Sequence, residues 1–330
     1  MYYIETESKD AAFHFSVEEY MMEFFPFDEP IMMIWQADKC AMLGNYQVAE
    51  AEIDMSYARQ AGIQVVRRSS GGGTIFTDLD TFLFTVIQPY EEGQPLQQIA
   101  QKTVAAPLVS ALDKIGVQAK AEGRNDILVE GKKISGMAQY VRHGRICSHG
   151  SLLYDTDMET LIRVLRVDEE KIRSKALRSI RSRVTNIKEH MSTPYSAQEF
   201  GELLKQKLFD AVQVREYSLT GHDLSAIEQI FQNKYNNPSW TFGKSPEFSF
   251  HNSKRFTGGK VEVYLNIIEG AVAACSIRGD FLGAVPIHGL EEQLTNKAFQ
   301  YEIFNDALDG ISLLLYLGNI TKDELLSCIF

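Results

Sequence analysis

The chain has 330 residues, of which 45% are apolar and 23% are charged, and its formal net charge at pH 7 is −11. This length exceeds the usual size of one domain, so one large and one small domain are expected in a globular protein of ordinary composition. The acidic balance excludes a general nucleic-acid or anionic-membrane binder, because neutralising phosphates requires a basic surface.

The sequence also predicts where the protein works. No segment reaches the length of a membrane span, and the first residues lack the basic and apolar regions of a signal peptide. The cysteines have no disulfide or metal spacing and stand at Cys40, Cys147, Cys275 and Cys328. We therefore expect a cytoplasmic protein, in a reducing compartment, with no membrane or nucleic-acid partner.

The N-terminal part predicts helices and short strands in alternation. Residues 13–25 place apolar side chains at helical spacing, and Pro26 ends the helix. Glu18, Glu19 and Glu23 fall mostly on the other face of this helix. Further along, strands are expected at 31–36, 41–44 and 63–66, with a helix at 50–62 that Gly62 ends.

A glycine-rich loop follows the strand at 63–66. It reads Arg67-Arg68-Ser69-Ser70-Gly71-Gly72-Gly73, and Thr74-Ile75-Phe76 returns to strand character. Consecutive glycines let backbone N–H groups approach a phosphate or carboxylate closely, and the arginines add charge at the rim. The motifs of P-loops and dinucleotide-binding loops are absent. The loop is therefore either an anion-binding turn of another kind or a flexible surface turn.

The next segment alternates strand and helix. Residues 81–88 form a dense β-branched and aromatic run closed by Pro89, which predicts a buried strand. Residues 95–115 carry a helical repeat that Gly116 ends, before a strand at 117–119. This alternation, combined with hairpins, predicts an α+β fold in which helices cover a mixed β-sheet.

A hairpin is expected around Glu130-Gly131. With a two-residue turn there, Asp126 would face Ser135, and Lys133 would share their side of the sheet. The apolar residues that enter the opposite layer would be Ile127, Val129 and Ile134. A carboxylate, an ammonium and a hydroxyl on one surface fit either a functional site or a solvated ion pair on a surface hairpin.

A second hairpin is expected at 140–153, with its turn at 142–145. His149 lies in the returning strand, where a lone histidine is more often a satisfied structural residue than a ligand contact, so no catalytic role is expected for it. Cys147 has no activating neighbours in sequence, which favours a small core residue over a nucleophile.

A basic run contrasts with the acidic whole. It follows a helix expected at 157–167 and consists of Lys171, Arg173, Lys175, Arg178, Arg181 and Arg183. Such a run is either a solvated helix face or a local patch for docking or phosphate contact.

The C-terminal part predicts a second, smaller unit. Helices are expected at 196–212 and 223–235, and the turn-rich stretch 236–243 interrupts the pattern. We therefore expect a catalytic domain at 1–245 and an accessory domain at 246–330. The accessory domain would be a small α/β unit with strands at 261–268 and 271–277 and helices at 290–300 and 303–317.

Four patterns, in this order, resemble those of the lipoate-protein ligases. They are the Arg-Arg-x-Ser-Gly-Gly-Gly loop at 67–73, Gly123-Arg124-Asn125-Asp126 with Lys133-Ile134-Ser135-Gly136, His149-Gly150-Ser151-Leu152-Leu153, and Arg181-Ser182-Arg183-Val184-Thr185-Asn186. Each pattern alone is weak, but their common order along the chain argues against chance.

The resemblance implies an ATP-dependent enzyme that activates lipoate as lipoyl-AMP and passes the lipoyl group to a specific lysine. The implied acceptors are lipoyl domains of 2-oxoacid dehydrogenase E2 subunits or the glycine-cleavage H protein. The implied fold is related to biotin ligases and class II synthetase cores, with a small C-terminal domain. Lys133 stands at the position of the family's essential lysine.

The chemistry of adenylation assigns roles to the two main motifs. Lys133 would lie between the substrate carboxylate and the α-phosphate, since a compact ammonium can be shared by two oxyanions. Asp126, with Asn125, would hold Mg²⁺ through oxygen ligands. The expected ATP- and lipoyl-AMP-binding residues are Arg68, Gly71, Gly72, Gly73, Thr74, Ile75, Phe76, Asn125, Asp126 and Lys133.

The chain departs from the family after the loop, where His-Asp and then Gly-Asn are usual and Thr77-Asp78 and Asp80-Thr81 stand here. We expect the activation chemistry to survive this change, whereas the preferred acyl group or acceptor is left open. Two other function classes also fit the sequence. One is a cysteine-dependent lipoyl amidotransferase using Cys147, and the other is a non-catalytic lipoate- or nucleotide-binding paralogue.

Overall fold

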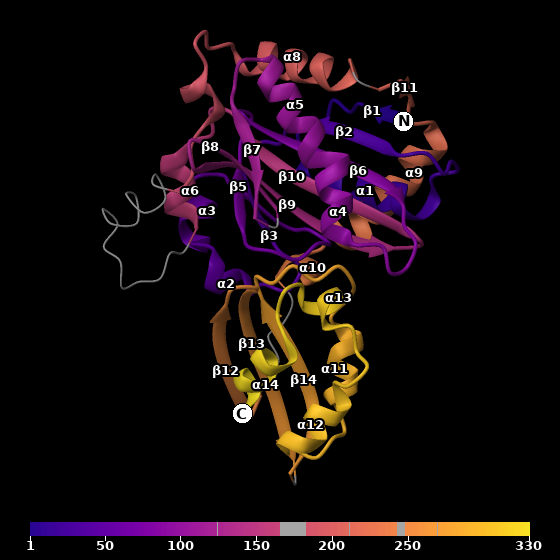
Figure 1. The fold of residues 1–330 in the computed structure, drawn as a ribbon, viewed down its shortest axis with the longest axis vertical. Helices are drawn as coiled ribbons and strands as arrows, with labels where there is room; N and C mark the ends of the chain where they lie inside the picture. The colour runs from indigo at the N-terminus through magenta and orange to yellow at the C-terminus, as the bar shows by residue number, and fades with distance from the viewer. Residues whose placement is uncertain (124, 166–182, 211, 243–247, 269) are drawn as a thin grey trace.

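The computed structural model describes residues 1–123, 125–165, 183–210, 212–242, 248–268 and 270–330. The strands of its main sheet are β1 (Tyr2–Ile4), β2 (Ile31–Trp35), β6 (Thr81–Pro89), β7 (Ala119–Glu122), β8 (Asp126–Val129), β9 (Lys132–Arg142), β10 (Arg145–Leu153) and β11 (Arg215–Glu216). They form an eight-stranded mixed sheet in the order β11-β1-β2-β6-β10-β9-β8-β7 (Figure 1). β1 pairs in parallel with β2 and β11, and the other pairs are antiparallel.

Helices cover both faces of this sheet, and β6 shows why. Leu83 and Ile87 pack into one core with helix α1 (Ala11–Phe24), whereas Phe82 and Phe84 pack into the core on the opposite face. Successive strand residues point to opposite faces, so a strand covered on both sides needs the continuous apolar run that the sequence shows. The first face also carries α9 (Gly221–Ile230) and η3 (Phe231–Tyr235), and the second carries α4 (Leu96–Ala100), η1 (Gln101–Ala105), α5 (Ala106–Lys114) and α8 (Ala197–Phe209).

A smaller sheet carries the glycine loop. β3 (Cys40–Leu43) pairs in parallel with β4 (Gln64–Arg67) and antiparallel with β5 (Ile75–Thr77). The loop therefore crosses from one outer strand to the other, so both of its ends are fixed. Short helices α2 (Ala49–Glu52), α3 (Met55–Gln60) and α6 (Met158–Val164) contribute to the core of this region, and η2 (Ile187–His190) and α10 (Pro238–Phe242) lie further along the chain.

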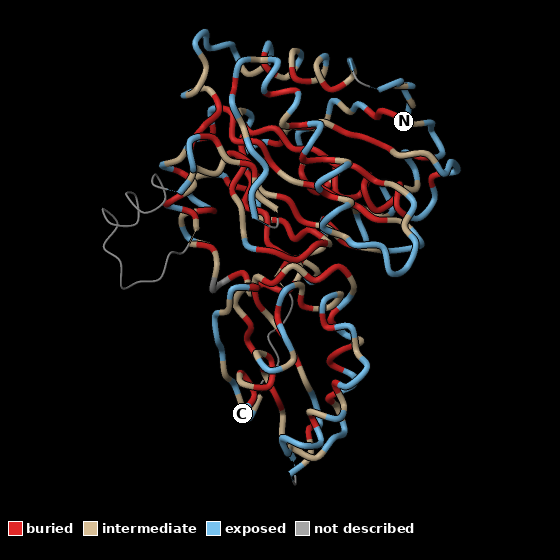
Figure 2. Tube along the Cα trace, in the orientation of Figure 1, coloured by how far each residue is buried: buried red, intermediate tan, exposed pale blue. Residues whose placement is uncertain are grey.

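The C-terminal part has a core of its own. Its antiparallel sheet consists of β12 (Phe250–Phe256), β13 (Gly259–Ile268) and β14 (Ala271–Gly279), and its helices are α11 (His288–Leu294), α12 (Tyr301–Ala307), α13 (Leu313–Leu317) and α14 (Lys322–Ile329). It meets the larger part at the glycine loop, where the Tyr46 ring stacks on Phe281 at a centroid distance of 4.9 Å. Figure 2 shows buried backbone in both parts and along the contact between them.

The predicted fold class is confirmed, whereas several element boundaries are wrong. The helix expected at 50–62 is divided, because Ile53 leaves it to form a β-bridge with Leu165. The helices expected at 290–300 and 303–317 are three shorter ones, since Asn296 and Gly310 have positive φ angles that end a helix. Strand β12 was missed because it is an edge strand with mostly exposed side chains.

Some expectations fall outside the described residues. The expected division at 245/246 lies within 243–247, and the basic run lies within 166–182 apart from Arg183. Arg124 of the second motif is also outside the described part of the chain. Among the described residues, no helix is long and apolar enough to cross a membrane.

Candidate functional site

A cavity of about 750 Å³ lies where the main sheet, the glycine loop and the C-terminal part meet. Its lining combines aromatic and apolar side chains with charged and polar ones. Apolar lining residues include Phe15, Trp35, Met42, Leu83 and Leu282, and polar ones include Arg68, Asn125, Asp126, Lys133, Ser135, His149 and Asp280. A cavity of this size and mixture suits a small molecule with an apolar tail and an anionic head.

The structure brings the two main motifs together at this cavity. The expected binding residues that line it are Arg68, Gly72, Gly73, Thr74, Ile75, Phe76, Asn125, Asp126 and Lys133. Gly71 is the exception, because it faces the C-terminal part, and a Cβ there would lie 2.5 Å from the Phe281 carbonyl oxygen. Gly72 and Lys133 therefore share one cleft, and their roles toward a ligand stay predictions.

The hairpin that carries Lys133 forms around the expected turn. Glu130 and Gly131 have φ angles of 50° and 77°, as a tight two-residue turn requires. Pairing begins in the expected register but shifts between Ile127 and Leu128, so Asp126 pairs with Gly136. The predicted pairing of Asp126 with Ser135 is wrong, because a β-bulge adds one residue to β9.

Asp126 and Lys133 form an ion pair at the mouth of the cavity. Lys133 Nζ lies 2.8 Å from Asp126 Oδ1, and the side chains are 37% and 35% exposed. Gly136 gives the ammonium room, since a Cβ at that position would lie 2.7 Å from Nζ. The backbone of Lys133 is fixed by hydrogen bonds with Arg183 and Thr185. The backbone of Lys133 is thus fixed, whereas its partly exposed ammonium group can exchange one partner for another.

One buried oxygen of this hairpin, Ser135 Oγ, has no hydrogen-bond partner among the described residues. Asp126 Oδ1 is also buried, and its partner is the Lys133 ammonium at 2.8 Å. Buried polar atoms are almost always satisfied in native proteins, so Ser135 Oγ, in the lining of the cavity, is a candidate contact for a bound ligand.

The glycine loop is shaped by its contact with the C-terminal part. Gly72 has a φ angle of +92°, which favours glycine, and its N–H donates to the Phe281 carbonyl at 3.0 Å. This donor is therefore directed toward the C-terminal part. Gly73, Thr74 and Ile75 continue the loop along the wall of the cavity.

The two arginines of the loop are buried, since Arg67 is 7% exposed and Arg68 is 6% exposed. The expectation that they add charge at the rim is therefore wrong. Arg67 donates to the carbonyls of Gly44, Gln47 and Thr241, at 2.9, 2.6 and 2.7 Å, and so ties the loop to α10. The carbonyls that accept from Arg67 come from distant segments, which no local sequence pattern records.

Four hydrogen bonds to described residues hold the Arg68 guanidinium inside the protein. Its Nε donates to Ser70 Oγ at 3.1 Å and its Nη1 to the Met42 carbonyl at 2.9 Å. Its Nη2 donates to the carbonyls of Gly71 and Gly73, each at 2.8 Å. Burial lowers the pKa of Arg68 to about 10, and the neighbouring Arg67 adds to the shift. The side chain lines the cavity, but its hydrogen bonds go to the glycine loop and to the Met42 carbonyl.

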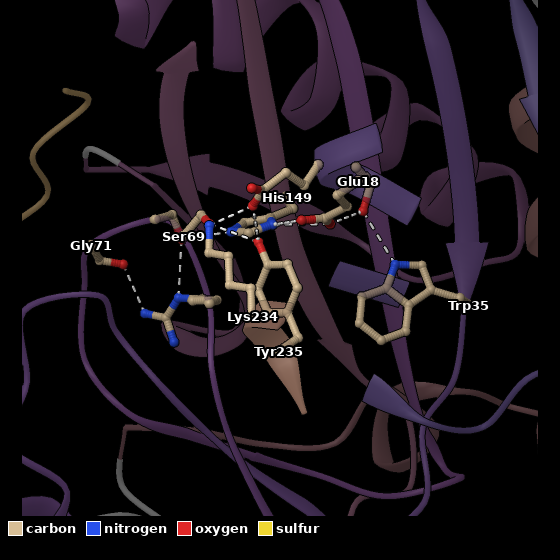
Figure 3. A network of polar contacts seen from close by, with 11 residues as sticks. Glu18, Trp35, Ser69, Gly71, His149, Lys234 and Tyr235 are labelled. Carbon is tan, nitrogen blue, oxygen red and sulfur yellow. Dashed lines mark hydrogen bonds and ion pairs between the residues drawn. The ribbon is translucent and has the colours of Figure 1, made fainter. Parts of the chain in front are cut away.

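Glu18 and His149 form a buried polar pair that the sequence did not reveal (Figure 3). Glu18 is 1% exposed, and its carboxylate lies 2.9 Å from His149 Nδ1 and 2.5 Å from Thr85 Oγ1. Glu18 lies on the side of α1 that faces the sheet, since Thr85 belongs to β6 and His149 to β10. His149 Nε2 lies 2.6 Å from Ser70 Oγ.

Glu19 anchors a second buried network. It accepts hydrogen bonds from Lys234 at 2.5 Å, Tyr235 at 2.7 Å and Arg142 at 2.8 Å. Burial disfavours its charged form, but these partners, led by Lys234, outweigh burial and lower the pKa of Glu19. Tyr235 also lies 2.7 Å from Ser69 Oγ, so this network reaches the glycine loop as well.

Cys147 is a core residue in the structure. Its side chain is fully buried, and burial raises the pKa of its thiol well above the usual range. It is not among the described residues that line the cavity. These features give a nucleophilic role no support, because the thiolate is the reactive form.

Comparison with protein families covers both parts of the chain. The family model of the lipoyl protein ligase A/B catalytic domain matches residues 10–209, and that of the bacterial lipoate protein ligase C-terminus matches residues 245–329. The chain is 35% identical to lipoate-protein ligase LplJ of Bacillus subtilis (strain 168), and the alignment covers 100% of both chains. It is 34% identical to a lipoate–protein ligase of Streptococcus pyogenes, with 97% of this chain and 96% of the relative covered.

Solved structures of ligases resemble the fold. A bi-partite lipoate protein ligase from Thermoplasma acidophilum, described with its E2 lipoyl domain, is 27% identical with a TM-score of 0.67 over 75% of this chain and 98% of its own. A lipoate-protein ligase A bound with ATP is 25% identical, with a TM-score of 0.63 over 73% of this chain and 98% of its own. LipL1 of P. falciparum in complex with lipoate shares the fold at 18% identity, with a TM-score of 0.78 over 99% of this chain and 97% of its own.

Proposed function

The chain belongs to the lipoate-protein ligase family, and we propose from this premise that it consumes ATP to activate lipoate as lipoyl-AMP and then lipoylates a specific lysine. A free carboxylate is a poor electrophile, so the acid must first gain a better leaving group. In the first step a carboxylate oxygen attacks the α-phosphorus of ATP and pyrophosphate leaves. In the second step the lysine amine attacks the acyl carbon, a C–N bond forms, AMP leaves and the amine loses a proton.

The ion pair of Lys133 and Asp126 is the observation that carries this proposal. The first step brings two anions together, the carboxylate and the α-phosphate, and a cation between them offsets their repulsion. Lys133 Nζ lies in the cavity, partly exposed, and its partner at 2.8 Å is a single carboxylate. The free energy needed to exchange that partner for a substrate oxyanion is small, because exposed ion pairs contribute little. The binding of ATP by a related ligase supports this reading.

Asp126 and Asn125 fit a bound Mg²⁺ in their chemistry. Both residues line the cavity, and carboxylate and amide oxygens are ligands that Mg²⁺ prefers. When bound, the metal would offset the charge of the ATP polyphosphate. Asp126 would turn toward the metal and release Lys133 for the substrate, which explains why the two residues share one hairpin.

The aromatic part of the cavity suits the acyl tail. Phe15, Trp35, Met42 and Leu83 provide apolar lining of the same cavity as Lys133. Water excluded from this lining also protects the mixed anhydride from hydrolysis. The lining explains how an eight-carbon acid is accommodated, and an octanoyl chain would satisfy the same apolar contacts.

We further propose that the acceptor lysine belongs to a lipoyl domain of a 2-oxoacid dehydrogenase E2 subunit or to the glycine-cleavage H protein. The related ligase from Thermoplasma acidophilum was described with its E2 lipoyl domain, which supports an acceptor of the first kind. Cytoplasmic location is part of this proposal, since four free cysteines suit a reducing compartment.

We propose residues 1–245 as the catalytic domain and 246–330 as the accessory domain. The C-terminal part has a separate hydrophobic core, which supports this division. Asp280 and Leu282 of the accessory part nevertheless line the cavity, and Phe281 accepts a hydrogen bond from Gly72. The accessory domain would thus complete the wall of the site.

Lipoate-dependent exchange of radiolabelled pyrophosphate into ATP tests the first step. We expect exchange with lipoate, measurable exchange with octanoate and none with biotin. Lipoylation of a purified E2 lipoyl domain, detected by mass spectrometry, tests the second step. A protein that binds lipoate but supports neither reaction would be a non-catalytic paralogue, and ATP-independent transfer lost in Cys147→Ala would identify an amidotransferase.

A further inference from the structure

A chain of hydrogen bonds connects the aromatic end of the cavity to the glycine loop (Figure 3). It consists of Glu18, His149, Ser70 and Arg68, which we call the loop network. The links are 2.9 Å from His149 Nδ1 to Glu18 Oε2, 2.6 Å from Ser70 Oγ to His149 Nε2, and 3.1 Å from Arg68 Nε to Ser70 Oγ. The four residues are 1%, 5%, 0% and 6% exposed, so water cannot replace a missing link.

The donors and acceptors of the loop network fit only one arrangement around a neutral imidazole. Arg68 Nε can only donate, so Ser70 Oγ accepts from it and gives its own hydrogen to His149 Nε2. His149 then carries its ring hydrogen on Nδ1 and donates to Glu18. Glu18 also accepts from Thr85 Oγ1. Each member holds the next, and the loss of one leaves its neighbours unsatisfied.

One end of the loop network holds the backbone of the glycine loop. Arg68 Nη2 donates to the carbonyls of Gly71 and Gly73, which flank Gly72 on both sides. Gly72 has the φ angle of +92° and lines the cavity. Glycine backbone is unusually free to change conformation, so these two bonds select one shape of the loop.

The other end lies beside the aromatic lining of the cavity. His149 pairs across the sheet with Ala138, which is two residues along β9 from Gly136, the residue over which Lys133 Nζ lies, so roughly 7 Å of strand separates these positions. His149 lines the cavity, and its ring centroid is 6.1 Å from that of Phe15. Both ring nitrogens are engaged, by Glu18 and by Ser70, so His149 acts on the rest of the site through these partners.

We propose that His149 is a positioning residue, which sets the shape of the glycine loop from the acyl end of the cavity by acting through Ser70 and Arg68. The inference rests on the proposed function in one respect, since the loop is assigned there to the nucleotide. It adds that a change at the acyl end alters the binding of ATP. The acid and ATP sites are thereby coupled through the protein, and the coupling is reciprocal.

Ser70→Ala separates this proposal from a local effect, because Ser70 is not among the described residues that line the cavity. Ser148→Ala is the matched control: it is a serine 2% exposed, and its Oγ accepts from Gln139 outside the loop network. In hydrogen–deuterium exchange of the full chain, the backbone amides of residues 71–75 should exchange about tenfold faster in Ser70→Ala than in wild type. Their exchange rates in Ser148→Ala should equal those of wild type. Equal exchange in both variants overturns the proposal.

Two substitutions at His149 provide a second readout, which also covers a Ser70 variant that fails to fold. Gln can accept from Ser70 with its carbonyl and donate to Glu18 with its amide, whereas Leu can do neither. We expect His149→Leu to raise the KM for ATP about five- to tenfold and His149→Gln to restore most of it. A purely structural role would lower kcat and stability without this rescue, and equal KM values in the two variants contradict the proposal.

The double variant Ser70→Ala/His149→Leu completes the test. Its KM for ATP should match that of the worse single variant, because both changes break the same chain, and additive effects count against the loop network. Failure of the proposed function is distinguishable: wild type would then show no lipoate-dependent pyrophosphate exchange. In that case the amide-exchange measurement alone decides whether the loop network shapes the loop.

Discussion

Two regions at the cavity each contain a cation and a carboxylate, but these groups are partly exposed in one region and buried in the other. The hairpin wall, defined as Asp126, Lys133 and Ser135, has an ion pair that is about one-third exposed and a serine without a hydrogen-bond partner among the described residues. The loop network is buried, and Arg68 alone donates to one hydroxyl and three backbone carbonyls. The hairpin wall therefore has a polar atom without a partner among the described residues, whereas the members of the loop network are bonded to one another.

The difference indicates which charges are available to a ligand. A buried guanidinium that already donates to a hydroxyl and three carbonyls would leave them unpaired if it turned to a substrate. An exposed ammonium that meets one carboxylate can change partner at little cost. Both residues stand in family motifs, so the motif alone does not separate the group that binds from the group that supports.

Lys133→Met should give the largest effect on the chemistry. Without the cation between two oxyanions, lipoate-dependent pyrophosphate exchange should fall about 100- to 1,000-fold. The free energy of unfolding should change by less than about 1 kcal/mol, because the ion pair is exposed. Lys132→Met is the control, since that lysine is not among the described residues that line the cavity. A similar loss of pyrophosphate exchange in both variants would contradict the assignment of Lys133 as the cation that meets the substrate.

Arg68→Met should instead act on stability. The carbonyls of Met42, Gly71 and Gly73 would lose their donor, and the free energy of unfolding should fall by roughly 3 kcal/mol in urea titrations. Arg59→Met, at an exposed position on α3, should change it by less than about 0.5 kcal/mol. An Arg68→Met protein that is fully stable yet inactive would place Arg68 with the hairpin wall.

His14 extends the comparison to pH. It is 0% exposed, stacks on Trp35 at 4.2 Å and lies 2.9 Å from the Ser8 carbonyl. Burial lowers its pKa from 6.5 to about 4, so the folded state holds the neutral form. Because the folded value lies below the unfolded one, its contribution is complete above pH 6.5 and is lost as the pH falls toward 4, up to about 3 kcal/mol.

The measurement for His14 is the free energy of unfolding between pH 4 and 6.5, compared between wild type and His14→Gln. Gln cannot take up a proton, so the slope with pH should flatten in the variant. The same slope in both proteins would mean that His14 is not held neutral in the fold.

Asp126→Asn should have the smallest effect on stability, below about 1 kcal/mol, and should raise the Mg²⁺ concentration needed for half-maximal exchange. Asp155→Asn is the control, because Asp155 forms a comparable ion pair with Lys188 at 2.6 Å and is not among the described residues lining the cavity. An unchanged Mg²⁺ requirement in Asp126→Asn would remove Asp126 from the proposed metal site.

The sequence predicts the fold class and the position of the hairpin because both depend on local patterns. A two-residue turn and a period of two are sufficient to bring Lys133 beside Asp126. The bulge that moves Asp126 from Ser135 to Gly136 has no comparable signal. Such a bulge depends on how β8 and β9 fit their neighbours.

The loop network was not predictable, because its members belong to α1, β10 and the loop. Glu18 falls outside the apolar positions of its helix, and only the packing of α1 on β6 and β10 buries it. His149 meets Ser70 through tertiary packing. The contribution of Asp280 and Leu282 to the cavity also depends on how the C-terminal part packs against the loop.

The most direct test of the difference between the two regions is calorimetric titration of a non-hydrolysable lipoyl-adenylate analogue. Wild type and Lys133→Met would be compared at equal folded concentration. We predict that the dissociation constant rises at least about tenfold in Lys133→Met, because a charge-assisted contact with the ligand is lost. An unchanged dissociation constant would contradict the assignment of Lys133 to the bound adenylate.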